Sequence, residues 1–179
     1  MTAAASDAAK PPPGPAPFRR AFVSNSFDLN RLDEPPFQLK IEPEDKISFK
    51  SDKLTEESVT VEIKISNTSN NRQTFKVKCT SNDIFRVRPP IGFIAAGETF
   101  PINLVLMTKE VPPSNRHFFA FYHMSCKDDD ENARALWTPR TKAEGVKRIP
   151  CEFLNANGTV HDDLADTQSM PPTIDLPPK

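Results

Sequence analysis

Four cations alternate with apolar residues in FKVKCTSNDIFRVRPPIGFI, residues 75–94. Lys76 and Lys78 form one pair, and Arg86 and Arg88 form the other. Alternate side chains of an extended strand point to the same side, so each pair places two positive charges on one surface. Such a surface suits charge-assisted hydrogen bonds to carboxylates. The alternative is a solvated sheet surface whose charges maintain solubility and discourage edge pairing.

Residue patterns for catalysis are missing from the sequence. There is no G-x-S-x-G, phosphate-binding loop, dinucleotide fingerprint or H-E-x-x-H. His117 and His123 lie six residues apart in one predicted strand, which separates them by about 20 Å and prevents them from sharing a metal. We interpret these two and His161 as structural or surface residues. The sequence therefore predicts no enzyme, no cofactor and no metal.

The cysteines and the acidic run also have simple interpretations. Cys79, Cys126 and Cys151 form no C-x-x-C pair, which predicts reduced thiols in a cytosolic protein. The run DDDEN, residues 128–132, lacks the ligand spacing of an EF-hand loop. It is more typical of a helix start, where carboxylates meet the positive end of the dipole.

Composition narrows the class of partner. The chain has 179 residues with 37% apolar residues and a net charge of -1, so neither nucleic acid nor an anionic membrane is expected as a partner. Residues 1–17 lack the apolar core of a signal peptide, and no apolar window reaches the ~20 residues of a membrane span. We expect a cytoplasmic protein without direct membrane insertion.

Period-2 alternation predicts a series of short strands with turns every eight to twelve residues, which indicates a two-sheet β-sandwich. The clearest is SVTVEIKIS, residues 58–66, with one polar face, whereas HFFAFYHMS, residues 117–125, is predicted to be buried on both faces. GFIAAGE, residues 92–98, is predicted to be a turn with a small bridge. The other predicted strands are 37–41, 46–49, 73–80, 84–89, 99–107 and 146–154.

One helix is predicted in KDDDENARALW, residues 127–137, with acidic residues in its first turn and Pro139 as its stop. Leu136 and Trp137 are expected to anchor it to the sandwich. Trp137 is interpreted as a core residue rather than a binding platform.

The ends of the chain differ from its middle. Residues 1–36 are rich in proline and alanine and are predicted to be mostly disordered, and residues 161–179 form an acidic, proline-rich tail. The folded domain is expected over residues 37–160. The sequence alone does not decide whether residues 18–36 dock on this domain.

The order of FKVKCT, VRP, G-x-I and Gly97-Glu98 resembles the signature of the major sperm protein (MSP) domain family, which includes nematode sperm proteins and the VAMP-associated proteins. LKIEPEDKISF, residues 39–49, and ENARALWTPRTKAEGVKRIPCEFL, residues 131–154, extend the match. The resemblance covers residues 37–160. It implies an all-β fold, a seven-stranded immunoglobulin-like β-sandwich, and no enzymatic activity.

The resemblance also implies a binding surface. In the VAMP-associated branch, the lysines of the F-K-V-K strand belong to an exposed basic face that binds short acidic peptides with paired aromatics. Lys76, Lys78 and Arg88 stand at matching positions, Thr80 follows on the same strand, and Arg148 replaces another lysine on the closing strand. These five residues are the candidate partner-binding residues.

Three departures bear on that surface. A Lys-x-Met pair that helps to hold the peptide in that branch corresponds here to Phe118 and Ala120, and Cys79 replaces a threonine. Those adaptors also end in a coiled coil and a membrane anchor, which this sequence does not show. We therefore do not expect the chain to tether a partner to a membrane by itself.

Two functions follow from the resemblance. The first is a non-enzymatic subunit or accessory factor of an MSP-type sperm cytoskeleton, in which the partners are other MSP-domain proteins and homo-oligomers are an option. The alternative is an adaptor without its own anchor, which binds acidic phenylalanine-containing peptides through the basic sheet face. The segment NSFDLNRLDE, residues 25–34, is a candidate to occupy such a groove in cis or to bind another MSP domain.

Overall fold

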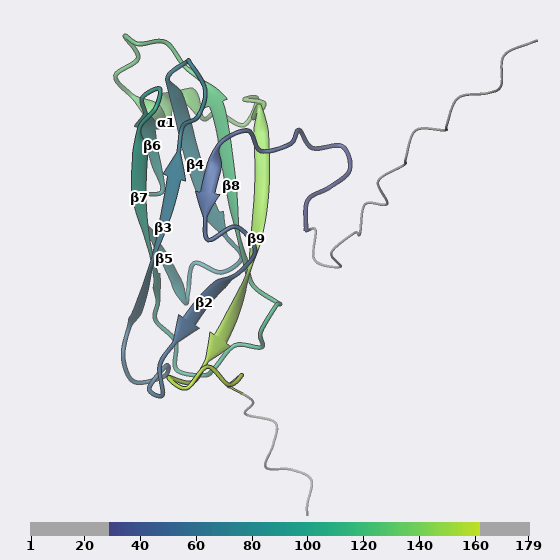
Figure 1. Ribbon diagram of the computed structural model, residues 1–179, viewed down its shortest axis with the longest axis vertical. Coiled ribbons are helices and arrows are strands. Elements are labelled where there is room, and N and C mark those ends of the chain that lie inside the picture. Colours follow the sequence, from purple (N-terminus) through teal and green to yellow (C-terminus); the bar gives the residue numbers. More distant parts are fainter. Residues whose placement is uncertain (1–28, 162–179) are drawn as a thin grey trace, which may run out of the picture.

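Alternating apolar residues form the inner faces of two β-sheets, which pack face to face in the computed structural model (Figure 1). The structure describes residues 29–161. The elements are β1 (Lys40–Glu42), β2 (Ile47–Lys50), β3 (Val59–Ser66), β4 (Gln73–Cys79), β5 (Phe85–Arg88), β6 (Ile91–Ile94), β7 (Thr99–Leu106), β8 (Phe118–Ser125), α1 (Ala133–Leu136) and β9 (Gly145–Leu154).

One sheet has four strands in the order β1-β3-β7-β5, and the other has five in the order β2-β9-β8-β4-β6. Only the β2–β9 pair is parallel among the strand pairs of residues 29–161. The core between the sheets is rich in phenylalanine. Its largest fully buried aromatic side chains are Phe49, Phe75, Phe85, Phe119, Phe121 and Phe153.

The predicted fold class is confirmed, and β3 shows why alternation was a good guide. Ile63 and Ile65 of β3 are fully buried, whereas Glu62 and Lys64 between them are exposed. The prediction for β8 also agrees with the structure, because Phe119 and Phe121 enter the core while the outer side chains Phe118 and Tyr122 are half-buried.

The nine strands of residues 29–161 exceed the seven of the expected sandwich, and β6 is the clearest difference. The segment expected to be a turn with a small bridge, residues 92–98, begins inside β6, which pairs with β4. Its turn follows at residues 95–98, where the Glu98 N–H donates to the Ala95 carbonyl. A Cβ atom on Gly92 would lie 2.8 Å from Cζ of Phe75, so the glycine allows the β6 backbone to lie against that ring.

The helix differs from the prediction. It spans only Ala133–Leu136, its first turn contains no acidic residue, and Asn132 is its N-cap. Arg72 donates to the carbonyl oxygens of Lys127, Asp128 and Asp130 at 2.8–3.0 Å, which stabilises the acidic run as a loop. The prediction of an acidic first turn was therefore wrong, because a distant arginine binds those carbonyls in the loop conformation.

Residues 29–36, which precede the first strand, run beside β9 (Figure 1). The contacts of the folded domain therefore extend beyond the boundary at residue 37 that the sequence suggested. The predictions for residues 1–28 and 162–179 lie outside the described residues. Within the described part of the chain, no helix is long and apolar enough to cross a membrane.

Candidate functional site

The paired lysines of β4 lie on the outer face of the five-stranded sheet. Phe75 and Val77 of the same strand are buried in the core, so the alternation turns Lys76 and Lys78 outward. The β4–β8 register places Lys76 beside Tyr122 and Lys78 beside Ala120. The first expectation of the sequence, two cations on one surface, is met at this strand.

Arg148 completes the same row across the sheet. Ala120 pairs with Lys78 on one side and with Arg148 of β9 on the other. Two strand spacings separate the backbones of Lys78 and Arg148, which is about 10 Å. We call this outer surface of β4, β8 and β9 the basic face.

A groove with a volume of about 820 Å³ lies on the basic face. We call it the basic groove. Its cations are Lys76, Lys78 and Lys142, and its aromatic side chains are Tyr122 and Trp137. Asp33, Glu34 and Pro35 line it from the N-terminal side. Aromatic rings and ammonium groups in one groove suit a ligand that carries both an aromatic ring and a carboxylate.

The aromatic side chains hold the lysines in place. The ammonium of Lys76 lies 5.8 Å from the Trp137 ring centroid, and that of Lys78 lies 5.7 Å from the Tyr122 ring centroid. Trp137 itself is held by its indole N–H, which donates to the Thr74 hydroxyl of β4 at 3.1 Å. Trp137 is thus a wall of the groove, in contrast to the expected core position.

Burial, and then repulsion by Lys78, lower the pKa of Lys76 from its ordinary value. Both effects disfavour the charged ammonium. A carboxylate bound between the two lysines would counter that repulsion and favour the charged form. Lys76 is therefore a cation that gains from an acidic ligand.

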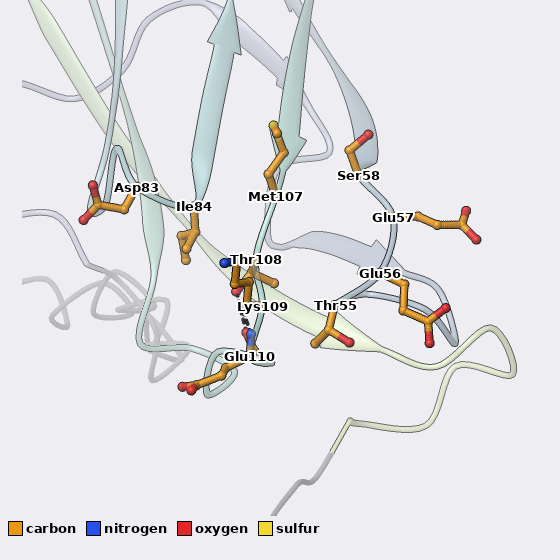
Figure 2. A pocket seen from close by; sticks show the side chains of 10 residues that line it. All are labelled: Thr55, Glu56, Glu57, Ser58, Asp83, Ile84, Met107, Thr108, Lys109 and Glu110. Carbon is orange, nitrogen blue, oxygen red and sulfur yellow. Dashed lines mark hydrogen bonds between the residues drawn. The ribbon is translucent and has the colours of Figure 1, made fainter.

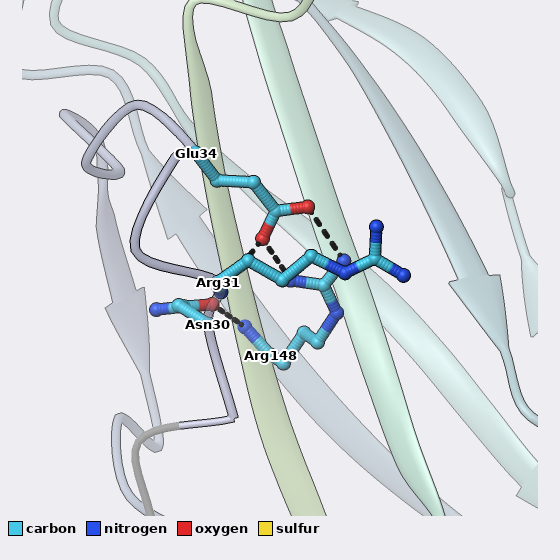
Figure 3. A network of polar contacts seen from close by, with 4 residues as sticks. All are labelled: Asn30, Arg31, Glu34 and Arg148. Atoms are coloured by element: carbon cyan, nitrogen blue, oxygen red, sulfur yellow. Dashed lines mark hydrogen bonds and ion pairs between the residues drawn. The ribbon is translucent and has the colours of Figure 1, made fainter.

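Arg148 already has an acidic partner. Both terminal nitrogens of its guanidinium bind the Glu34 carboxylate, and the bond from Nη2 to Oε1 is 2.7 Å long (Figure 3). The backbone N–H of Arg148 donates to the Asn30 side chain at 2.9 Å. Hydrogen bonding to Arg148 lowers the pKa of Glu34 to about 2. The side chains are 10% exposed for Arg148 and 18% for Glu34, so this pair is largely withdrawn from solvent.

The other two candidates lie apart from the groove. The Thr80 hydroxyl is 2.9 Å from Nδ1 of His117, beyond the end of β4. Arg88 belongs to β5, an edge strand of the opposite sheet, where it pairs with Asn103. Arg88 is not among the described residues that line the groove. The structure therefore brings together Lys76, Lys78 and Arg148 but not Arg88.

Phe118 and Ala120, which stand at the positions of the Lys-x-Met pair, lie within the basic face. Ala120 is only 3% exposed between Lys78 and Arg148, so it forms a shallow floor there. Phe118 is half-buried, and its ring centroid is 6.0 Å from the guanidinium carbon of Arg148. Sequence reasoning missed Tyr122 as a groove residue, although its spacing from Phe118 and Ala120 on the same face of β8 was the available signal.

A second cavity lies at the opposite end of the sandwich. It has a volume of about 580 Å³, with Ile84 and Met107 among its lining residues. Figure 2 shows that the side chains of Asp83 and Glu57 point to different sides of it. Within residues 29–161, no group of three His, Cys, Asp or Glu side chains is arranged to bind a metal.

The cysteine thiols have environments that disfavour reactivity. Burial raises the pKa of Cys79, Cys126 and Cys151, most strongly for Cys151, which is fully buried. A raised thiol pKa keeps the nucleophilic thiolate scarce near neutral pH. The described residues thus present binding chemistry at the basic groove and no activated thiol.

Comparison with known proteins gives relatives of two kinds. The family model described as the MSP (Major sperm protein) domain matches residues 38–142. The uncharacterized protein R05D3.5 of Caenorhabditis elegans is 40% identical over 114 residues, which are 62% of this chain and 61% of that protein. Human vesicle-associated membrane protein-associated protein B/C is 26% identical over 129 residues, which are 69% of this chain and 52% of that protein. The match therefore spans about three fifths of the first relative and about half of the second.

Two solved structures of MSP-family proteins share the fold of this chain. The structure of SSP-19, an MSP-domain protein like family member in C. elegans, has a TM-score of 0.53 at 18% identity and covers 63% of this chain and 96% of its own. WR4, a C. elegans MSP family member, has a TM-score of 0.52 at 16% identity, and the match covers 64% of this chain and 96% of WR4. At these identities the similarity shows the shared fold.

Proposed function

Because this chain belongs to the MSP (major sperm protein) domain family, we propose that it acts by protein–protein association through the basic face. The partner is an acidic segment that contains phenylalanine, and no reaction is catalysed. The single observation that supports this most directly is the basic groove, in which Lys76 and Lys78 lie beside Tyr122 and Trp137. The expected location of such a protein is the cytoplasm.

The groove suits this ligand in both charge and shape. Lys76, Lys78 and Lys142 outnumber Asp33 and Glu34 among the charged residues that line it, so the groove keeps a net positive charge. The Tyr122 and Trp137 rings offer surfaces on which a phenylalanine ring packs in an offset or edge-to-face arrangement. Thr80 and Arg88 would contact a ligand only if it extends beyond the groove toward the ends of β4 and β5.

The first test is a double charge reversal, Lys76→Asp with Lys78→Asp. Binding of a labelled acidic phenylalanine-containing peptide would be measured by fluorescence anisotropy. We expect affinity to fall by at least about tenfold, since 1.4 kcal/mol corresponds to a factor of ten and each lost contact is charge-assisted. Circular dichroism would check that the sandwich is intact, which is expected because both side chains point outward.

The matched control is Lys53→Asp with Lys109→Asp. Both of these lysines are exposed and lie outside the basic groove, and the substitution changes the net charge by the same amount. The control should bind the peptide as the wild type does. Equal affinity of the wild type and the Lys76/Lys78 variant would remove the basic face from consideration.

A second candidate function is that of a subunit or accessory factor of an MSP-type sperm cytoskeleton. The match to the MSP (Major sperm protein) domain family supports it, as do the edge strands β1, β2, β5 and β6, which have backbone groups available for pairing. Light scattering over a concentration series, alone and with a filament-forming MSP protein, tests it. Concentration-dependent oligomers or co-assembly support this function. A chain that stays monomeric at every concentration and does not bind the MSP protein contradicts it.

A further inference from the structure

The N-terminal part of β9, residues 145–150, has one edge that pairs with no other strand of its sheet. β8 pairs with residues 145–150 along one edge, and β2 pairs only with residues 151–154 along the other. The backbone N–H groups of Val146 and Arg148 bond to residues 30–36 instead of to a strand, and Pro150 has no N–H. This short edge is therefore a place where another segment can add to the sheet.

Residues 30–36, which we call the N-terminal strap, occupy that edge. The carbonyl oxygen of Pro35 accepts from the Val146 N–H at 3.0 Å, and Pro36 forms a parallel bridge with Val146. The Asn30 side chain accepts from the Arg148 N–H, and Glu34 binds the Arg148 guanidinium (Figure 3). Backbone pairing and a carboxylate on an arginine are the two kinds of contact that an external acidic segment would make here.

The strap also changes the charge of the face. Asp33 and Glu34 of the strap line the basic groove opposite Lys76, Lys78 and Lys142. Without the strap, these three lysines and Arg148 would form a group of four cations, and no carboxylate would remain among the groove residues. The strap thus neutralises about half of the charge that an acidic ligand would meet.

We propose that the N-terminal strap is a built-in acidic ligand of the basic face, which an external acidic segment must displace from Arg148 and from the β9 edge. This inference rests on the proposed function and adds its regulation. The apparent affinity for a partner then depends on the fraction of molecules in which the strap is released.

The strap has the features of a segment that can be released. Its turn is closed by the Glu34 N–H, which donates to the Arg31 carbonyl at 3.1 Å, and Leu32 at the tip is fully exposed. Of its apolar residues, Leu32 and Pro36 are exposed and Pro35 is half-buried, so its hold on the domain depends mainly on the polar contacts described above. Segments of this kind open locally without unfolding the domain.

The first experiment measures release directly by hydrogen–deuterium exchange on the full chain. Glu34→Gln removes the charge and keeps the shape, and Asn30→Ala with Glu34→Gln removes a second contact. We expect the Val146 and Arg148 amides to exchange about tenfold faster, as local opening costs less. The Val77 amide, which bonds to Pro90 at 2.8 Å, should not change. Unchanged Val146 exchange in both variants would overturn the proposal.

The control for charge is Glu62→Gln. Glu62 lies on β3 of the other sheet, where it forms an exposed ion pair with Lys64. This substitution removes the same charge from the chain and leaves the strap intact. Its Val146 exchange should match that of the wild type, and faster exchange would mean that general charge, not the strap contact, controls the opening.

The second experiment measures competition. The probe is a fluorescein-labelled peptide with the sequence of residues 25–36, NSFDLNRLDEPP, supplied to the full chain in trans. We expect the Glu34→Gln protein to bind it about five- to tenfold tighter than the wild type, because the released fraction rises. A probe that carries Glu34→Gln itself should bind both proteins more weakly.

The two proposals fail in different ways. If the strap does not compete, probe affinity will depend on Lys76 and Lys78 but will be equal in the wild type and the Glu34→Gln protein. If the basic face does not bind acidic segments at all, reversal of both lysines will leave affinity unchanged in every background, and the inference falls with the function on which it rests.

Discussion

His123 of β8 joins the chain that precedes β1 to the sandwich through both ring nitrogens. Nδ1 is 3.0 Å from Oε1 of Gln73, and Nε2 accepts from the Gln38 N–H at 3.1 Å. The Gln38 contact makes Nε2 the acceptor, so the neutral ring carries its proton on Nδ1. The ring is fully buried, and a Cβ atom on Gly145 would lie 2.1 Å from Nε2, which leaves no room for a side chain there.

This arrangement predicts a loss of stability in mild acid. Burial lowers the pKa of His123 in the folded state, so the unfolded chain binds a proton first as the pH falls. Stability is then fully present above the unfolded pKa and declines below it. Urea unfolding should show a loss of about 1 kcal/mol between about pH 7.5 and 5.5. His123→Gln should reduce this pH dependence.

His117 is the control residue for this prediction. Burial lowers its pKa too, so His117→Gln should remove only its own part of the pH dependence. Glu34 does not interfere, because its pKa is lowered to about 2 and its stabilising effect declines only as the pH falls below its unfolded value near 4.5. An unchanged pH dependence in the His123→Gln protein would contradict the assignment of a neutral buried ring.

Single residues of the basic face differ in how far the sequence reveals them. Lys76 and Lys78 were predictable because alternation in one strand sets their direction. The partnership of Glu34 with Arg148 was not, because these residues lie 114 positions apart and meet only when the strap reaches β9. The sequence did indicate residues 25–34 as an acidic segment that could occupy the groove. In the structure, Asn30 and Glu34 of that segment bind Arg148 on the basic face, beside the groove.

At the scale of elements, α1 serves mainly to position Trp137. The helix has only four residues and no buried side chain, so its own stability is small. Trp137 follows it directly, and its indole N–H bonds to the Thr74 hydroxyl, which in turn donates to the Gly92 carbonyl at 2.9 Å. One wall of the basic groove therefore depends on a hydrogen-bond chain through β4 and β6.

A double-mutant cycle tests this link. Trp137→Phe removes the indole N–H and keeps an aromatic ring, and Thr74→Val removes the hydroxyl. Each should lower the free energy of unfolding in urea, and the coupling between them should be about 1 kcal/mol, the usual net value of one hydrogen bond. Strictly additive effects would mean that the indole bond does not hold the groove wall.

Elements were predictable where local pattern decides them and not where distant contacts do. The period-2 alternation of β3 and β4 predicted which of their side chains face the core and which face outward. The acidic run before α1 resembled a helix start, but Arg72, 56 positions before Asp128, binds its carbonyls in a loop. The stretch of β6 was predicted as part of a turn with a small bridge and not as a full strand, because its pairing partner, β4, cannot be identified from the stretch itself.

At the scale of the whole molecule, a net charge of -1 conceals a local separation of charge. Three lysines, Lys76, Lys78 and Lys142, meet in the basic groove, and the strap brings two carboxylates to it. An external acidic segment that displaces the strap exchanges one ion pair at Arg148 for another. In the Glu34→Gln protein, no such exchange is needed, because Arg148 has lost its carboxylate partner.

This difference predicts how salt affects binding. Screening weakens exposed charge pairs as the Debye length falls from about 14 Å at 0.05 M to about 4 Å at 0.5 M salt. For the wild type, salt weakens the ligand and also the attraction of the exposed Asp33 of the strap to the groove lysines, whereas the largely withdrawn Glu34–Arg148 pair is screened less. The effects on the strap and on the ligand partly cancel. For the Glu34→Gln protein, only the ligand is weakened, so the affinity for the residue 25–36 peptide should fall more steeply with salt. Anisotropy titrations across that range measure both slopes, and equal slopes would indicate that the strap and the ligand do not compete for the same charges.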